Sequence, residues 1–282
     1  MQWFFEHWRE LAISILGSFG AIFLALESYE VLTDSNVKIS FFCFIILGIC
    51  PGIIAFLIDG VYISGFLKRE VVISEATAQT KIRVKLGDIF NEKGWIAIAT
   101  SDFFDSIVDE NLISSKSLHG YVLNKYWPDN RNNWQKQIDA SLRSIEGVRE
   151  KRSKGNTIRY PIGTVARARS DGHRFLFVAL GRTNLSDNVT SASAESLICA
   201  VRGLLREARA ACSMEPLIIP LMGSGLARVG IKYSVLVDLI IVAIQEEARL
   251  GLITREILVV LPNEKSYQIN LKNYSRNWKH GK

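Results

Sequence analysis

The sequence has little of what metal sites and nucleophilic catalysis require. It contains 4 cysteines and 4 histidines in 282 residues, and no two cysteines have the spacing of a metal-binding pair. Cys43 and Cys50 lie in an apolar stretch, and Cys199 and Cys212 fall in a predicted helix. We interpret all of them as reduced packing residues. Because no nucleophile, base and orienting group form a recognisable set, we predict no catalytic residue, no metal site and no cofactor.

Two further features are missing, namely runs of basic residues interleaved with aromatic ones, and internal repeats. The net charge of +6 is compatible with nucleic acid, anionic lipid or an anionic small molecule. Without a basic and aromatic run, nucleic acid is the least favoured of these partners, and we predict no nucleic-acid binding. The mean hydropathy is positive, and the apolar residues are concentrated near the N-terminus.

Two long segments near the N-terminus lack charge altogether, residues 11–26 and residues 39–58. A helix needs roughly 20 residues to cross the hydrocarbon core of a bilayer, so the second segment is long enough. The first is shorter, but with Glu27 at its end it can reach the interface by tilting or snorkelling. We therefore predict a two-helix transmembrane hairpin in the lipid bilayer, with helices at about 9–29 and 39–67.

The flanking charges predict the orientation of this hairpin. Lys68 and Arg69 close the second helix, whereas the connection carries three acidic residues and only one basic residue. By the positive-inside tendency both termini face the cytoplasm, which makes the chain a multi-pass membrane protein. A signal peptide is the alternative for the first segment. The glutamates at its start and the absence of a small-residue cleavage site argue against it.

Four glycines in the two segments, Gly17, Gly20, Gly48 and Gly52, would permit close contact between the helices. The last two form a small-xxx-small pair, the spacing that lets helix backbones approach. The alternative is that glycine is simply common in membrane helices.

From about residue 80 the pattern changes to short apolar segments that alternate with amphipathic helices, which is typical of an α/β domain. The expected strands are 81–86, 95–99, 175–180, 217–221 and 257–261. Amphipathic helices are expected around 197–208 and 236–244, and a more polar helix from 133 to 151. We interpret 149–156 as a solvated turn or hairpin tip.

Polar and glycine-rich turns follow the expected strands. They are Gly87-Asp88-Ile89, Ser101-Asp102-Phe103, Gly223-Ser224-Gly225 and Pro262-Asn263. In open α/β sheets a ligand binds beyond the carboxyl ends of the strands. Asp88 could accept a hydrogen bond from an adenine amine, and Phe103 could face a base or sugar. The glycine turn, with a helix starting near Lys232, could hold a diphosphate through backbone N–H groups.

These turns, with Gly87-Asp88-Ile89 and the segment from Pro220 to Leu226 as the best matches, resemble the macro domain, an ADP-ribose-binding fold. The resemblance covers roughly residues 80–265. With two membrane helices in front, the chain is similar to the membrane-anchored macro-domain effectors of Thoeris-type anti-phage systems. It implies an α/β macro-like domain with a mixed central sheet flanked by helices. The implied organisation is hairpin 1–70, linker 71–79, macro-like domain 80–265 and C-terminal tail 266–282.

The resemblance also implies a set of ligand-binding residues. Asp88 would read the adenine amine, Ile89 would pack against the base, and the loop after the fourth strand would bind phosphate. The complete predicted set is Asp88, Ile89, Ser101, Asp102, Phe103, Leu118, His119, Gly120, Met222, Gly223, Ser224, Gly225, Leu226, Ala227, Arg228, Pro262 and Asn263.

Several of these residues have a second interpretation. Asp88 could merely cap a turn, as aspartates at strand ends often do. Asp102 could be a general base, or it could accept hydrogen bonds from a ribose or the backbone. His119 could touch a distal group or be structural, and Arg228 could pair with phosphate or simply lie on the surface.

Departures from the family pattern bear on function. Hydrolytic macro domains have an asparagine-rich turn and a run of glycines where this chain has residues 99–102 and 114–120, so the resemblance implies binding rather than hydrolysis. It implies a sensor of an ADP-ribose-derived signal made by a TIR-domain partner enzyme, understood to be a histidine adduct of ADP-ribose. Binding would drive homo-oligomerisation and membrane disruption, causing abortive infection. The alternatives are a membrane-tethered ADP-ribosyl hydrolase and a passive scaffold for ADP-ribosylated partners.

Overall fold

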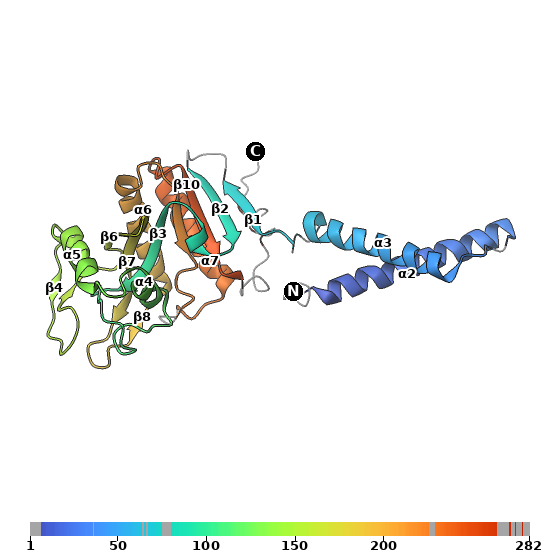
Figure 1. The fold of residues 1–282 in the computed structure, drawn as a ribbon. Helices are drawn as coiled ribbons and strands as arrows, with labels where there is room; N and C mark the ends of the chain where they lie inside the picture. The colour runs from blue at the N-terminus through green and yellow to red at the C-terminus, as the bar shows by residue number, and fades with distance from the viewer. Residues whose placement is uncertain are drawn as a thin grey trace. The chain divides into compact units, whose positions relative to one another are not determined.

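The computed structural model describes residues 7–35, 37–63, 65, 67–74, 80–225 and 229–263, together with residues 271, 274 and 278. The chain forms two compact units that divide near residue 70. The first contains two long helices, and the second contains a mixed sheet with helices on both faces (Figure 1).

The first unit is a helical hairpin. Helix α2 spans Trp8–Thr33 and helix α3 spans Phe41–Ile58, which continues as a π-helical turn, η1, over Asp59–Ile63. Both helices are long and apolar enough to cross a membrane. Many of their large apolar side chains are exposed, which gives the hairpin broad apolar outer faces.

Glycines set the contact between the two helices. A Cβ atom at Gly48 would clash with the ring of Phe19, and one at Gly52 would lie 2.7 Å from the Cα atom of Ile15. The expected role of this glycine pair in close helix contact is therefore confirmed. At Gly17 and Gly20 an added Cβ atom would meet no described atom within 4 Å, so these two glycines have no part in the contact.

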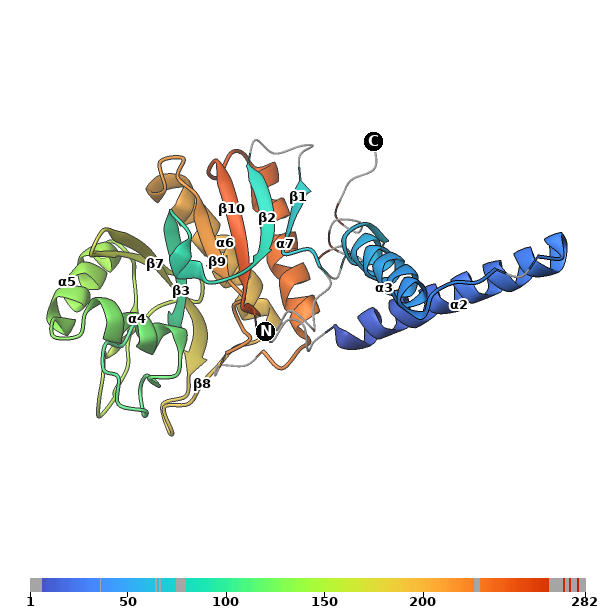
Figure 2. The same cartoon turned by 45° about the vertical axis from the view of Figure 1, so that its right-hand side comes forward.

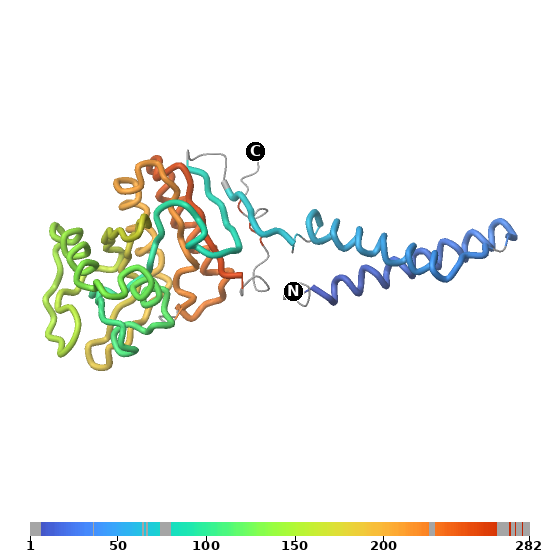
Figure 3. The backbone as a smooth tube through the Cα atoms, viewed as in Figure 1, coloured from blue at the N-terminus to red at the C-terminus, as the bar shows by residue number. Residues whose placement is uncertain are grey.

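The second unit is built on an eight-stranded sheet with the order β1-β2-β10-β9-β3-β7-β6, in which β8 also pairs with β7. Strands β2, β10, β9, β3 and β7 are parallel to one another, whereas β1, β6 and β8 are antiparallel to their neighbours. The strands are β1 Glu70–Ser74, β2 Lys81–Leu86, β3 Trp95–Ser101, β6 Val165–Ser170, β7 His173–Thr183, β8 Thr190–Ser191, β9 Leu217–Pro220 and β10 Glu256–Leu261. Figure 3 shows the path of the chain between them.

Helices cover both faces of this sheet (Figures 1 and 2). Helices α4 (Leu118–Tyr126) and α5 (Arg131–Leu142) lie on one face, and α6 (Ala194–Ala211) and α7 (Tyr233–Arg249) lie on the other. Because side chains alternate along a strand, each central strand supplies apolar residues to both layers. On the α4 and α5 side, Trp134 and Ile138 pack with Ile96, Ile98 and Phe177. The expected mixed α/β fold is thus confirmed.

Some element predictions were wrong. Strand β1 lies partly within the predicted linker, and β6 was not expected, because its alternation is carried by small alanines between arginines. The polar helix predicted for 133–151 ends at Leu142, where its buried stripe of Trp134, Ile138 and Leu142 ends. The chain then forms a separate hairpin of β4 (Val148–Arg149) and β5 (Ile158–Arg159).

The tip of that hairpin is also not fully solvated, contrary to expectation. The side chain of Arg152 is only 2% exposed, because it forms an ion pair with the equally buried Asp105. Composition alone predicted a surface turn here, since the partner carboxylate lies 47 residues away in the sequence.

Candidate functional site

A cleft of about 1030 Å³ lies at the carboxyl ends of the parallel strands. Because five neighbouring strands run the same way, the turns that follow them meet at one edge of the sheet. The volume is at the upper end of the range of small-molecule sites, and both apolar and polar groups line it.

The cleft brings together most of the predicted ligand-binding residues from distant parts of the sequence. Those that line it are Asp88, Ile89, Ser101, Leu118, His119, Met222, Gly223, Ser224, Gly225, Pro262 and Asn263. The predicted residues Leu226, Ala227 and Arg228 lie outside the described residues. Three others, Asp102, Phe103 and Gly120, are described and do not line the cleft.

The position of Asp88 is compatible with both roles that the sequence left open, a cap of the turn and a contact with an adenine amine. Its Oδ1 atom accepts a hydrogen bond from the backbone N–H of Phe90 at 3.0 Å, which caps the short 3-10 helix η2 (Ile89–Asn91). The residue is also exposed and lines the cleft beside the buried Ile89. The turn contact is thus present, and the contact with an adenine amine stays a prediction.

The glycine-rich turn after β9 has the backbone conformation that its sequence requires. Gly223 has a φ angle of +79°, and a Cβ atom there would lie 2.7 Å from a methyl group of Val229. The Ser224 hydroxyl donates to the carbonyl of Leu221 at 2.6 Å, and the N–H of Val229 donates to the carbonyl of Gly223 at 3.1 Å. These contacts hold the described ends of the turn in a tight curve beside the cleft.

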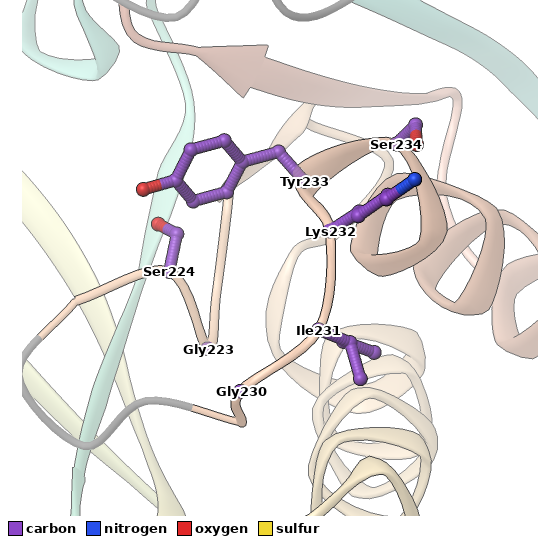
Figure 4. A pocket seen from close by; sticks show the side chains of 7 residues that line it. All are labelled: Gly223, Ser224, Gly230, Ile231, Lys232, Tyr233 and Ser234. Atoms are coloured by element: carbon purple, nitrogen blue, oxygen red, sulfur yellow. The ribbon is translucent and has the colours of Figure 1, made fainter.

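A second hollow, of about 540 Å³, lies between this turn and the first residues of α7 (Figure 4). It shares Gly223, Ser224 and Tyr233 with the larger cleft. In Figure 4 the side chains of Ser224 and Tyr233 lie near each other, whereas Lys232 extends to the other side of the helix start. The first N–H groups of a helix have no intrahelical partner and carry partial positive charge, so this border favours an anion.

His119 lies near the N-terminus of α4, which is capped by the Ser117 hydroxyl accepting from the N–H of Gly120 at 3.0 Å. The imidazole packs against Trp134 and Phe177, with ring centroids 5.5 and 5.6 Å away. Burial lowers the pKa of His119 to about 3, so the ring is neutral near pH 7. Its Nε2 atom has no hydrogen-bond partner among the described residues.

The prediction that Gly120 lines the ligand site is not supported by its position. Gly120 is buried in α4, and a Cβ atom there would clash with the carbonyl oxygen of Ser114. A glycine is needed because the preceding loop crosses the helix at this point, which is a packing role.

Asp102 and Phe103 are turned away from the cleft, which corrects their predicted placement. Asp102 is 1% exposed; its Oδ1 atom accepts from the N–H of Thr183 at 3.1 Å, and Oδ2 lies 3.6 Å from Nη1 of Arg159. Phe103 is fully buried, with the guanidinium carbons of Arg152 and Arg159 at 4.0 and 4.9 Å from its ring centroid. Burial raises the pKa of Asp102, although Thr183 and Arg159 act in the opposite direction.

The cleft also contains residues that the sequence analysis missed. Phe90 lines it directly after Asp88 and Ile89, and its ring packs 5.3 Å from that of Tyr121, with the Nζ atom of Lys125 at 4.9 Å. An aromatic residue immediately after the motif was an available signal. The loops at 110–117 and 187–190 also line the cleft, but they carry no motif that would mark them.

The described carboxylates that line the cleft are engaged in their own turns. Glu110 accepts from the Ser114 hydroxyl at 2.7 Å and the Ser115 N–H at 2.8 Å, and Asp187 accepts from the Val189 N–H at 2.9 Å. Within the described part of the chain, no group of three or more histidine, cysteine, aspartate or glutamate side chains could hold a metal ion. The arrangement offers apolar walls, backbone N–H groups and a few acceptors, which suits binding of a nucleotide.

Comparison with solved structures defines the class of the fold. Two macrodomain mutants from Oceanobacillus iheyensis, one of them with ADPR, each superpose with a TM-score of 0.52 at 14% sequence identity. The alignments cover 75% of this chain and 95% and 100% of the two structures. The sheet and its helices therefore form a macrodomain fold.

Sequence comparison places the chain in a specific family within this fold. Residues 82–262 match the family described as Thoeris protein ThsA, Macro domain, and the chain belongs to this family. It is also 27% identical over 154 residues to the Thoeris protein ThsA of Bacillus amyloliquefaciens (strain Y2). That alignment covers 53% of this chain, which spans about half the length of the curated relative. The resemblance inferred from the strand-end motifs is thereby confirmed.

Proposed function

We propose that this chain is a membrane-anchored sensor that binds an ADP-ribose-derived nucleotide in the cleft at the strand ends. The observation that carries this proposal is the meeting of Asp88 and the Gly223–Gly225 turn in one cleft of a ThsA-type macro domain. In the proposed pose, Asp88 and Ile89 bind the adenine, and the glycine turn binds the diphosphate together with the start of α7.

Phe90 adds an aromatic wall beside the proposed adenine position. Because Tyr121 and Lys125 already pack against its ring, stacking of a base there would need little further ordering of the side chain. This supports a nucleotide rather than a simple phosphate as the ligand.

The proposal assigns binding rather than hydrolysis to the cleft. In this chain Asp102, the strand-end acid that a hydrolase could use as a base, pairs with Arg159 and the Thr183 backbone. His119 is neutral and packed between aromatic rings. Neither of these two residues is thus placed to act as a general base on a water molecule in the cleft.

The output of the proposed sensor is membrane disruption by oligomers. Two helices cannot enclose a conducting path alone, so a pore would need several copies of the hairpin. The signal would be made by a TIR-domain enzyme of the same defence system, with a histidine adduct of ADP-ribose as the favoured form. The chain would then sit in the bacterial inner membrane with its macro domain in the cytoplasm.

Calorimetry on the full chain in lipid nanodiscs tests the binding step. ADP-ribose and its histidine adduct should bind, whereas inorganic phosphate should bind far more weakly. Release of free ADP-ribose from an ADP-ribosylated protein, lost in an Asp102→Asn variant, would instead identify the hydrolase. Absence of binding by either nucleotide would contradict the proposed site.

Native mass measurement and dye release from vesicles test the output step. Addition of the bound nucleotide should increase the number of copies per assembly and release dye from vesicles that contain the full chain. Binding without a change in assembly or leakage would favour a passive scaffold.

A further inference from the structure

A buried cluster of charged side chains lies between the turn after β3 and the β4–β5 hairpin. The side chains of Arg152 and Asp105 are each 2% exposed, and Nη1 of Arg152 lies 3.1 Å from both carboxylate oxygens of Asp105. The backbone N–H of Asn156 donates to the same carboxylate at 2.7 Å. Burying an ion pair costs free energy unless further hydrogen bonds satisfy its groups. Here Nη1 and Nη2 of Arg152 also donate to Asn156 and Asn188, whereas Nε has no partner among the described residues. The hairpin is thus fixed to the turn.

Arg152 does not itself line the cleft, but it forms a hydrogen bond with a loop that does. Its Nη2 atom donates to Oδ1 of Asn188 at 3.2 Å. Asn188 lines the cleft with Asp187, Val189 and Thr190, and its φ angle of 57° lies in the left-handed region. One hydrogen bond therefore connects the buried ion pair to the middle of the 184–190 loop.

The second arginine of the hairpin fixes the start of that loop. Nη2 of Arg159 donates to the carbonyl of Thr183 at 3.0 Å, while the N–H of Thr183 donates to Asp102 at 3.1 Å. The hydroxyl of Thr183 is 2.9 Å from that of Thr190, at the other end of the loop. The start and the centre of the loop are therefore tied to the hairpin and to the turn after β3, and its other end is tied to its start.

A glycine makes this docking possible. Gly155 has a φ angle of +83°, and a Cβ atom there would clash with Oδ1 of Asp105. Any larger residue would push the hairpin away from the carboxylate that pairs with Arg152.

We propose that Arg152 and Arg159 are positioning residues, which hold the 184–190 loop as a preformed wall of the ligand cleft. This inference rests on the proposed binding function. It means that ligand affinity depends on hairpin residues that touch no ligand. Because coupling is reciprocal, a ligand in the cleft also stabilises the docked hairpin.

Hydrogen exchange on the full chain in nanodiscs, without ligand, tests the positioning itself. Arg152→Lys keeps the charge but cannot reach both Asp105 and Asn188, so amides of residues 184–190 should exchange faster than in the unchanged chain. Amides in the centre of β7 should be unaffected. The matched control is Arg149→Lys, at an exposed position on the same hairpin. Equal exchange in the two variants would overturn the proposal.

Calorimetry with ADP-ribose then tests the consequence for affinity. If the loop keeps its binding geometry about a tenth of the time in Arg152→Lys, the affinity falls about tenfold. Thr183→Val, which replaces only the hydroxyl that contacts Thr190 with a methyl group, should give a smaller loss with the same exchange pattern. Faster exchange with unchanged affinity would overturn the positioning role. If the unchanged chain fails to bind ADP-ribose, that result counts against the proposed function. The hydrogen-exchange comparison then tests by itself whether Arg152 positions the loop.

Discussion

Two turns at the same edge of the sheet, residues 87–91 and 101–105, begin with similar sequences and have opposite environments. Each combines an aspartate with an aromatic residue directly after a parallel strand. Asp88 and Phe90 line the cleft, whereas Asp102 and Phe103 are buried beneath two arginines of the β4–β5 hairpin. The position of a polar residue at a strand end predicts the edge where it lies. Its direction depends on what packs over it.

The largest expected effect is on stability, at the buried turn. Asp102→Ala would leave Arg159 without this partner and Thr183 without an acceptor, so the free energy of unfolding should fall by about 3 kcal/mol. Urea unfolding of the full chain in detergent, followed by tryptophan fluorescence, measures this loss. Asp88→Ala is the control and should lose about 1 kcal/mol, the contribution of a cap. Equal losses would mean that the two turns are energetically alike.

A second effect concerns His119, which lines the cleft yet is as buried as the second turn. Its pKa is about 3 in the folded chain against an ordinary value of 6.5, so the folded state binds the proton less tightly. The contribution of this pKa shift to the free energy of unfolding is fully present above pH 6.5, and it is lost as the pH falls towards 3. At pH 5 the loss is on the order of 2 kcal/mol, and His119→Gln should abolish it. Unfolding at pH 7.5 and pH 5 measures the difference; an equal decrease in both proteins would contradict it.

A third effect is on affinity, at the exposed turn. Asp88→Ala should weaken ADP-ribose binding about tenfold, because a hydrogen bond to a charged acceptor is lost. Asp88→Asn keeps an oxygen that can accept from the N–H of Phe90 and should lose less affinity. Calorimetry on both variants measures the difference. An affinity unchanged by Asp88→Ala would leave only the turn role for this residue.

The smallest expected effect compares the two aromatic residues. Phe90→Leu should weaken nucleotide binding about threefold with little change in unfolding, because stacking is worth about 0.5–1.5 kcal/mol. Phe103→Leu should do the reverse, since its ring packs against two guanidinium groups and does not line the cleft. Binding and unfolding measured on the same samples decide the comparison. A loss of affinity in Phe103→Leu alone would reverse the assignment.

The sequence was sufficient to predict the parallel strands, the edge where their turns meet and the macro-like fold. Those features follow from local patterns such as Ile96–Ile98 and Gly87-Asp88-Ile89. The orientation of Asp102 and the burial of Arg152 could not be predicted in this way, because each depends on a partner about 50 residues away. The role of Phe90 could have been inferred, since it directly follows the motif.

The strand order has a consequence for synthesis of the chain. Strand β10 lies between β2 and β9 and pairs with both, so it joins the two halves of the sheet although it is the last of the described strands along the sequence. The apolar hairpin is synthesised before the sheet, and residues 81–101 must wait for residues 256–261 before the sheet can close. Until then the unpaired edges of β2 and β9 are open to other chains. A chain that stops before residue 256 therefore keeps the apolar helices α2 and α3 but lacks the strand that completes the cleft.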